Sequence, residues 1–339
     1  MVARMINAFV DPFALACPSE EDGREHLERY LTSLLEWRDL AETECLSTYG
    51  TATAAQVLTT TGGFPPWQRV RTLIERFGMA EELGPQDVFN VLQRFTDRMP
   101  TIEESLGVDD LLLDNVQCVP ASYKARAAAF ADEFERLLAL ISLLVELRGL
   151  PVSQQMVITR DLARCPEQLQ FKAVVLDAEG PSAAEIAIPK DVAGGLGAYG
   201  CSAQLKLAVD PLQLWEQGCY RFAVELFTGR QAVAASVNAI PRWSLGAHFA
   251  DSVEGLNVTG RAIGQSILRA CAKTVLSQDM AAVHAIRVSA AANADQRKRG
   301  QDSAWRRDVD HEYHLHYWNT SAGPELAVLA AHKDLGIPE

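Results

Sequence analysis

The 339-residue sequence lacks an apolar run long enough to cross a membrane. Its apolar stretches are short, such as LLALI before Ser142 and LLV after it, whereas a membrane-spanning helix needs about 20 such residues. The first residues, MVARMINAFVDPFALACPSE, do not show a basic region followed by an apolar core and a small-residue cleavage site, so no secretory signal is indicated. We therefore expect a cytoplasmic protein without a membrane partner.

Two common cofactor motifs are also missing. The seven cysteines are scattered and form no C-x-x-C pair, which excludes a zinc ribbon. GLNVTGRA (255–262) has the two glycines of a P-loop, but Arg261 and Ala262 stand where a lysine and a hydroxyl residue must be. PKDVAGGLGAYG (189–200) has no complete dinucleotide fingerprint, and a plain loop is the favoured interpretation. These segments indicate no cofactor.

The acidic charge is concentrated in the front of the chain. The formal net charge is −13, and residues 1–150 hold 24 of the 44 acidic residues but only 13 of the 31 basic ones. A surface of this sign repels a phosphate backbone. We therefore expect the front domain to bind a protein partner, and nucleic acid to be bound only through the C-terminal domain.

Residues 1–150 are predicted to form an acidic α-helical domain. Helical spacing of apolar residues, prolines at helix starts and closing Gly or Pro residues predict helices over 19–40, 64–78, 84–100 and 121–148. Gly149 and Pro151 mark the predicted boundary.

Residues 151–339 are predicted to form an α+β domain, because short runs rich in Val, Ile and Phe follow, and a helix is expected over 259–280. QQMVITRDL, LQFKAVVLDA, EIAIPKDV and AQLKLAVD are predicted strands. The fold class expected for the chain is therefore α+β, with a C-terminal antiparallel hairpin over 306–334.

The most unusual stretch is RRDVDHEYHLHYW (306–318), which contains three carboxylates and three histidines. As one strand, it places every second side chain on one face, and that face is entirely ionisable: Asp308, Asp310, Glu312, His314 and His316. NTSAG supplies a turn and PELAVLAAHKD a second strand. A register with His316 opposite Leu326 puts Asp310 opposite His332.

This hairpin has three interpretations. The first is a catalytic site of Asp310, Glu312, His314, His316 and His332, either through acid/base chemistry or through a divalent metal held by Asp310, Glu312 and His314. The second is a solvated strand face whose Asp and His side chains satisfy one another. The third is an edge that binds a partner.

A nearby basic segment is a candidate anion site, although such short runs are most often solvated loops. Its members are Arg297, Lys298, Arg299, Arg306 and Arg307.

The same hairpin resembles the closing hairpin of RelE/ParE-type toxins, over AWRRDVDHEYHLHYW and ELAVLAAHKD. The resemblance covers only the segment from Ala304 to Asp334. His314 stands where the toxin pattern has arginine, His332 and Lys333 fall near its basic end, and its terminal tyrosine is missing. The resemblance implies ribonuclease or toxin-like chemistry in a bacterial conflict system.

Two functions follow as expectations. The sequence favours a cytosolic interaction subunit of a larger bacterial assembly, such as an anti-phage defence or toxin system, because it contains no complete catalytic motif. The alternative is a hydrolase that cleaves a phosphoester with the C-terminal hairpin, using metal or acid/base groups.

Overall fold

The computed structural model describes residues 6–338 except 20–22, 42, 44, 82–83, 98, 108–109, 120–126, 161–167, 178–179, 188–195 and 290–293. The chain divides into two compact units, which we call the front unit (Met5–Leu205) and the rear unit (from Lys206 onward). Both helices and strands occur in each unit, so the expected mixed α+β class is confirmed. Each unit is described below by itself.

The division between the units differs from the boundary expected near Gly149. Strand β4 (Gln155–Ile158) pairs with β1 (Ile6–Val10), and β7 (Gly197–Tyr199) pairs with β4. Because strands on both sides of residue 150 share one sheet, residues 1–150 do not form a separate domain. The front unit is also not purely helical, since β1 and β2 (Leu46–Tyr49) belong to this sheet.

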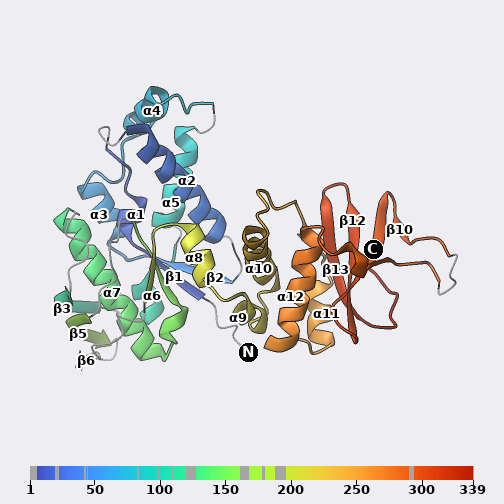
Figure 1. The fold of residues 1–339 in the computed structure, drawn as a ribbon. Helices are drawn as coiled ribbons and strands as arrows, with labels where there is room; N and C mark the ends of the chain where they lie inside the picture. Colours follow the sequence, from blue (N-terminus) through green and yellow to red (C-terminus); the bar gives the residue numbers. More distant parts are fainter. Residues whose placement is uncertain are drawn as a thin grey trace. The chain divides into compact units, whose positions relative to one another are not determined.

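The sheet of the front unit is parallel, with the strand order β2-β1-β4-β7. Strands β1 and β4 are almost completely buried, and they lie among the helices of the front unit (Figure 1). A strand buried on both faces has a nearly continuous apolar sequence, and INAFV and QMVI each contain one polar residue, Asn7 and Gln155, whose side chains bond to each other. A second sheet, with the order β3-β5-β6, is antiparallel. It consists of β3 (Asp110–Val119), β5 (Gln168–Asp177) and β6 (Gly180–Ala187).

Helices account for most of the remaining front unit. Those predicted over 64–78, 84–100 and 121–148 are present with shorter bounds, and residues 121–126 lie outside the described residues. AQLKLAVD, predicted as a strand, is instead mostly helix α8. The bounds are α1 Pro12–Leu15, α2 Gly23–Ala41, α3 Ala54–Thr60, α4 Trp67–Arg76, α5 Pro85–Asp97, α6 Ile102–Leu106, α7 Ala128–Arg148 and α8 Ser202–Ala208.

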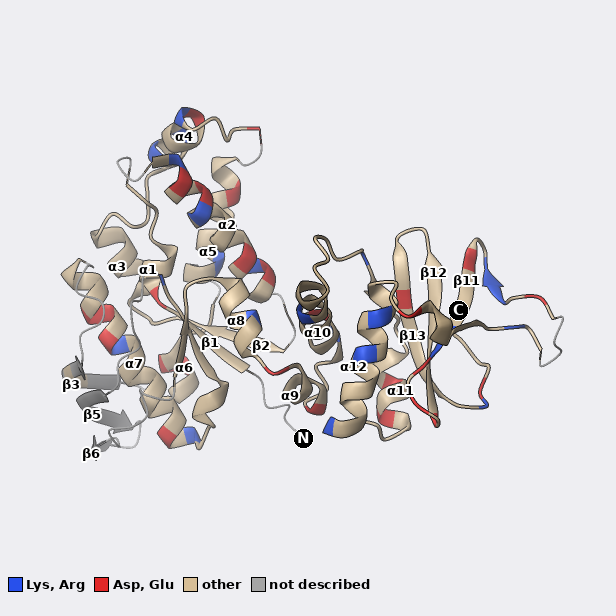
Figure 2. Ribbon diagram, in the orientation of Figure 1, with Lys and Arg blue, Asp and Glu red and all other residues tan. Residues whose placement is uncertain are grey.

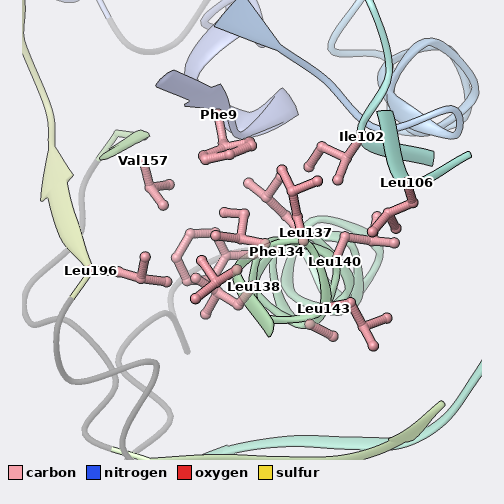
Figure 3. Packing of buried hydrophobic residues seen from close by; sticks show 14 residues of the cluster. Phe9, Ile102, Leu106, Phe134, Leu137, Leu138, Leu140, Leu143, Val157 and Leu196 are labelled. Carbon is pink, nitrogen blue, oxygen red and sulfur yellow. The ribbon is translucent and has the colours of Figure 1, made fainter. Parts of the chain in front are cut away.

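Helix α7 provides the main core of the front unit. Its residues Phe134 and Leu137 are fully buried and belong to one cluster with Phe9 of β1, Val157 of β4 and Leu196. Figure 3 shows these side chains directed toward one another across the helix–sheet contact. This packing orients the parallel sheet and therefore fixes where its carboxyl edge lies.

The rear unit combines helices with a sheet whose strands are antiparallel except for one parallel edge strand, β8. Fully buried Trp215 packs against Gly264, where an added Cβ would lie 2.5 Å from the indole, so only glycine fits. The sheet order is β10-β11-β12-β13-β8, with β9 also paired to β11, and the expected C-terminal hairpin is confirmed as β12 and β13. The helices are α9 Pro211–Glu216, α10 Tyr220–Ala234, α11 Phe249–Gly255 and α12 Arg261–Val275. The strands are β8 Ser244–Leu245, β9 Val283–Ala285, β10 Lys298–Arg299, β11 Asp302–Asp308, β12 Tyr313–Thr320 and β13 Gly323–Ala331.

In the described part of the chain, no helix combines the length and apolar character that crossing a membrane requires.

Candidate functional site

Polar residues follow each strand of the parallel sheet at its carboxyl end. Asp11 follows β1, Thr51 follows β2, Thr159 follows β4 and Cys201 follows β7 after one glycine. In parallel α/β sheets, ligands bind at this edge, next to the place where successive connections run in opposite directions. Here the chain moves from β1 to β2 on one side and later adds β4 on the other side of β1. That switch point therefore lies between β1 and β4.

Asp11 and Thr159 join the two strands at the switch point. The Oδ1 atom of Asp11 accepts a hydrogen bond from Phe13 N at 3.1 Å and caps α1, while its Oδ2 atom accepts from Thr159 Oγ1 at 2.5 Å. The backbone N–H of Asp11 also donates to Ile158 O. Asp11 is completely buried, so it holds the backbone of this edge rather than contacting a ligand.

A cavity of about 940 Å³ opens at this edge of the front unit. Thr159, Arg160, Gly200 and Cys201 line it from the ends of β4 and β7, and Phe13 lines it from α1. Ligand cavities in proteins usually enclose roughly 300–1,000 Å³. The cavity thus has the position and the size of a binding site for a small molecule.

Two arginines of the cavity wall are held in place by backbone carbonyls. Arg160 donates to Ala16 O at 2.9 Å, and its guanidinium lies 4.6 Å from the centre of the Phe13 ring. Arg69, from α4, donates to Pro18 O at 3.0 Å and to Gly62 O. These contacts fix the positions of both guanidiniums. The wall therefore carries two fixed cations.

Helix α2 contributes charged residues of both signs, mainly acidic ones, to the cavity wall. It contributes Glu25, Glu28 and Glu36 to the lining, together with His26 and Arg29. Acidic and basic residues alternate along this helix (Figure 2). The Oε2 atom of Glu36 accepts a 2.6 Å hydrogen bond from the buried Ser202 hydroxyl at the start of α8, which fixes the carboxylate at the cavity.

A second buried carboxylate, besides that of Asp11, lies near the end of β2. Glu133 of α7 accepts hydrogen bonds from the hydroxyls of Thr51 and Thr53 and is only 5% exposed. Burial raises the pKa of Glu133 above its ordinary value, although the two hydroxyls and Arg136 act in the opposite direction. The carboxyl edge thus contains three carboxylates that accept hydrogen bonds from hydroxyl groups, those of Asp11, Glu133 and Glu36.

The ionisable stretch of the rear unit does not form the single strand that its alternation predicts. Residues 309–312 form a turn between β11 and β12, and Asp310 Oδ1 accepts from the backbone N–H groups of Glu312 and Tyr313. The expected register is also wrong, because His316 lies opposite Val328 and Leu326 lies opposite Tyr317. Ala327 is the extra residue of a β-bulge between these pairs.

Part of the predicted cluster is nevertheless present. The ring of His314 lies 4.8 Å from that of His332 and 6.4 Å from that of His316, measured between ring centres. Asp308, directly opposite His314, takes the place expected for Asp310, with 3.2 Å between Asp308 Oδ1 and His314 Nε2. Asp310 and Glu312 stay in the turn and do not join the cluster.

A hydrogen bond defines the tautomer of buried His316. A carbonyl oxygen only accepts, so the neutral ring donates from Nδ1 to Gly336 O at 2.7 Å, whereas His314 Nε2 lies 3.2 Å from Asp308 Oδ1. The other nitrogen of each ring is buried without a hydrogen-bond partner. Burial lowers the pKa of both histidines, and nearby Arg306 lowers it further. Both rings are therefore disposed to remain neutral.

The geometry does not support the predicted metal site. Among the described residues, no group of three or more His, Cys, Asp and Glu side chains is arranged to hold a metal ion. Asp310, Glu312 and His314 are thus not assembled as ligands.

The basic segment does not converge on an anion either. Arg299 pairs with Asp302 and Glu325 and lies 4.8 Å from the Trp318 ring centre. Arg307 is buried on the other sheet face, where it donates to Thr274 Oγ1 and to the carbonyls of Gln278 and Asp279. Lys298 is exposed.

The sequence interpretation missed the cavity residues of the front unit. Their signal is a polar residue directly after a short apolar run, as in AFVDP for Asp11 and MVITR for Thr159 and Arg160. The signal becomes specific only when the two runs are known to be adjacent parallel strands.

No protein-family model matches this chain, and comparisons with curated proteins and with solved structures also give no match.

Proposed function

We propose that the front unit binds a small phosphorylated ligand, of about nucleotide size, in the cavity at the carboxyl edge of its parallel sheet. The observation that carries this proposal is the pair of fixed guanidiniums, Arg69 and Arg160, in a cavity beside the switch point. Arginine matches phosphate oxygens with its planar set of N–H donors. Arg29 of α2 adds a third guanidinium to the lining.

The charge of the chain favours a small ligand over a nucleic acid. The front of the sequence is strongly acidic, and a long phosphate backbone would approach many carboxylates outside the cavity. A single phosphate group needs only the local field of Arg69 and Arg160. The proposal shares a phosphorylated ligand with the alternative expected from sequence, but it concerns binding and places the ligand in the front unit instead of at the hairpin.

The interaction-subunit function stays a prediction, as do a protein partner for the acidic front of the chain and a role in a bacterial defence or toxin system. In the rear unit, buried His314 contacts the exposed carboxylate of Asp308, but the unpartnered ring nitrogens of His314 and His316 are enclosed. Hydrolysis by the hairpin therefore has less geometric support than ligand binding in the cavity.

Isothermal titration calorimetry of the full-length protein with pyrophosphate and with ADP, CDP, GDP and UDP tests the proposal. Binding is expected, and Arg160→Ala and Arg69→Ala should each weaken it about tenfold or more, because a charge-assisted hydrogen bond contributes roughly 1.5–3 kcal/mol. Arg71→Ala is the matched control. It removes an exposed arginine of α4 that pairs with Glu75 and does not line the cavity.

Thermal unfolding of each variant separates lost binding from lost folding. If none of these probes binds the wild-type protein at millimolar concentration, the proposal is wrong. Equal weakening by Arg71→Ala would show a general surface-charge effect and would contradict a role for the cavity.

A further inference from the structure

We infer that the ligand of the front cavity is a ribonucleotide and that Glu36 recognises its ribose hydroxyls. This inference rests on the proposed function and specifies the class of ligand. It starts from the charges of the cavity lining, which are of both signs. Arg69 and Arg160 line the cavity outside α2, whereas α2 contributes three carboxylates, those of Glu25, Glu28 and Glu36, and one guanidinium, that of Arg29.

A ligand that is anionic throughout does not fit this lining. Its charge would be attracted by the arginines and repelled by Glu25, Glu28 and Glu36. A matching molecule has phosphate at one end and neutral hydrogen-bond donors at the other. Inorganic phosphate also leaves most of the roughly 940 Å³ unfilled.

Glu36 is the best-positioned acceptor for such donors. Ser202 donates to its Oε2 atom at 2.6 Å and thereby fixes the carboxylate. An ionised carboxylate only accepts hydrogen bonds and has about four lone-pair positions, so one bond to Ser202 leaves room for two hydroxyl donors. By contrast, the carboxylate of Glu28 is paired with Arg24.

The two hydroxyls of a vicinal diol are close enough for both to donate hydrogen bonds to one carboxylate. Acidic side chains recognise ribose in this way in nucleotide-binding α/β folds. A nucleotide therefore satisfies both ends of the cavity, with phosphate at the arginines and ribose at Glu36. The ligand is then expected to lose affinity when its sugar hydroxyls are removed.

The test compares ADP, CDP, GDP and UDP, each against its own 2′,3′-dideoxy form. Pyrophosphate is included as a probe that lacks ribose. For at least one base, the full-length wild-type protein should bind the ribose form about tenfold or more tightly. Glu36→Gln should abolish this preference and leave pyrophosphate affinity within about twofold. Ser202→Ala should reduce the preference, because it frees the carboxylate to move.

Glu28→Gln is the matched control, since it also neutralises a carboxylate of the α2 wall and should retain the ribose preference. Pyrophosphate binding with equal affinities for the ribose and dideoxy forms would overturn the inference and leave the proposed function intact. Retained preference in Glu36→Gln would also overturn it. Failure of every probe, pyrophosphate included, would overturn both proposals.

Discussion

Thr159 Oγ1 donates a 2.5 Å hydrogen bond to Asp11 Oδ2, and this bond ties the carboxyl end of β4 to that of β1. Both residues are buried, and Arg160 of the cavity wall directly follows Thr159. The residues that shape the candidate site are thus anchored by a polar pair at the centre of the sheet.

Thr159→Val is expected to destabilise the protein by about 1–3 kcal/mol, because it leaves the buried Asp11 carboxylate without its hydroxyl donor. Urea denaturation measures the change. Thr72→Val is the control, since Thr72 is exposed on α4 and its hydroxyl bonds only to the carbonyl of Gln68. A cost in Thr159→Val no larger than in Thr72→Val would show that the pair contributes little.

Glu133→Gln is expected to change how stability depends on pH. The pKa of Glu133 is raised above 4.5 in the folded protein, mainly by burial, so its contribution favours folding at low pH and is lost as pH rises through the folded-state pKa. Glutamine does not ionise, so the variant does not lose this stability as pH rises. Its stability relative to wild type should therefore increase between pH 4.5 and 7.5, as measured by thermal unfolding.

Glu146→Gln provides the comparison, because Glu146 is exposed on the same helix. A stability difference between Glu133→Gln and wild type that does not vary with pH would contradict the assignment of a raised pKa to Glu133.

The sequence predicts the long helices better than the parallel sheet. Helix α7 has 21 residues and ends at Gly149, which adopts the left-handed conformation, so its periodicity and its end are both visible in the sequence. Strands β1 and β4 have five and four residues and almost no alternation. A run this short does not distinguish a buried strand from a helix segment, and nothing local reveals that β1 pairs with β4.

The hairpin shows that sequence-based prediction of the candidate site residues is limited in the same way. Alternation correctly places Asp308, His314 and His316 on one face of the sheet. In the structure, Asp308 lies opposite His314 and Arg306 lies opposite His316 on the neighbouring strand. It misplaces Asp310, whose side chain instead caps the turn. The bulge at Ala327 shifts the register, and its position follows from packing that the sequence alone does not display.

His316→Asn is expected to reduce the loss of stability in mild acid. The pKa of His316 is lowered below 6.5, mainly by burial, and His314 and Arg306 add to this effect. The unfolded chain therefore binds more protons than the folded one as pH falls from about 7.5 toward the folded-state pKa, and stability decreases over that range. Asparagine cannot titrate there, and its amide can still donate to Gly336 O.

Urea midpoints at pH 7.5 and 5.5 measure this effect. His311→Asn is the control, because the His311 side chain is 88% exposed in the turn. If His316→Asn loses as much stability on acidification as wild type and His311→Asn do, His316 does not account for the pH dependence.

Ile337→Ala is expected to destabilise the rear unit by about 2–5 kcal/mol, the usual cost of truncating a buried isoleucine. Ile337 is 6% exposed and packs in a small core with Ile286, Ala304 and Trp318. The residues on either side of it accept hydrogen bonds from buried rings, since Gly336 O accepts from His316 Nδ1 and Pro338 O accepts from Trp318 Nε1 at 2.8 Å. Loss of the isoleucine side chain should therefore loosen both bonds and expose the Trp318 indole to water.

Urea denaturation followed by tryptophan fluorescence measures the stability and the environment of the indole together. Ile240→Ala is the control, because Ile240 is 43% exposed and its truncation should cost no more than about 0.5 kcal/mol. Equal, small effects of the two substitutions would mean that Ile337 does not help to bury the rings of His316 and Trp318.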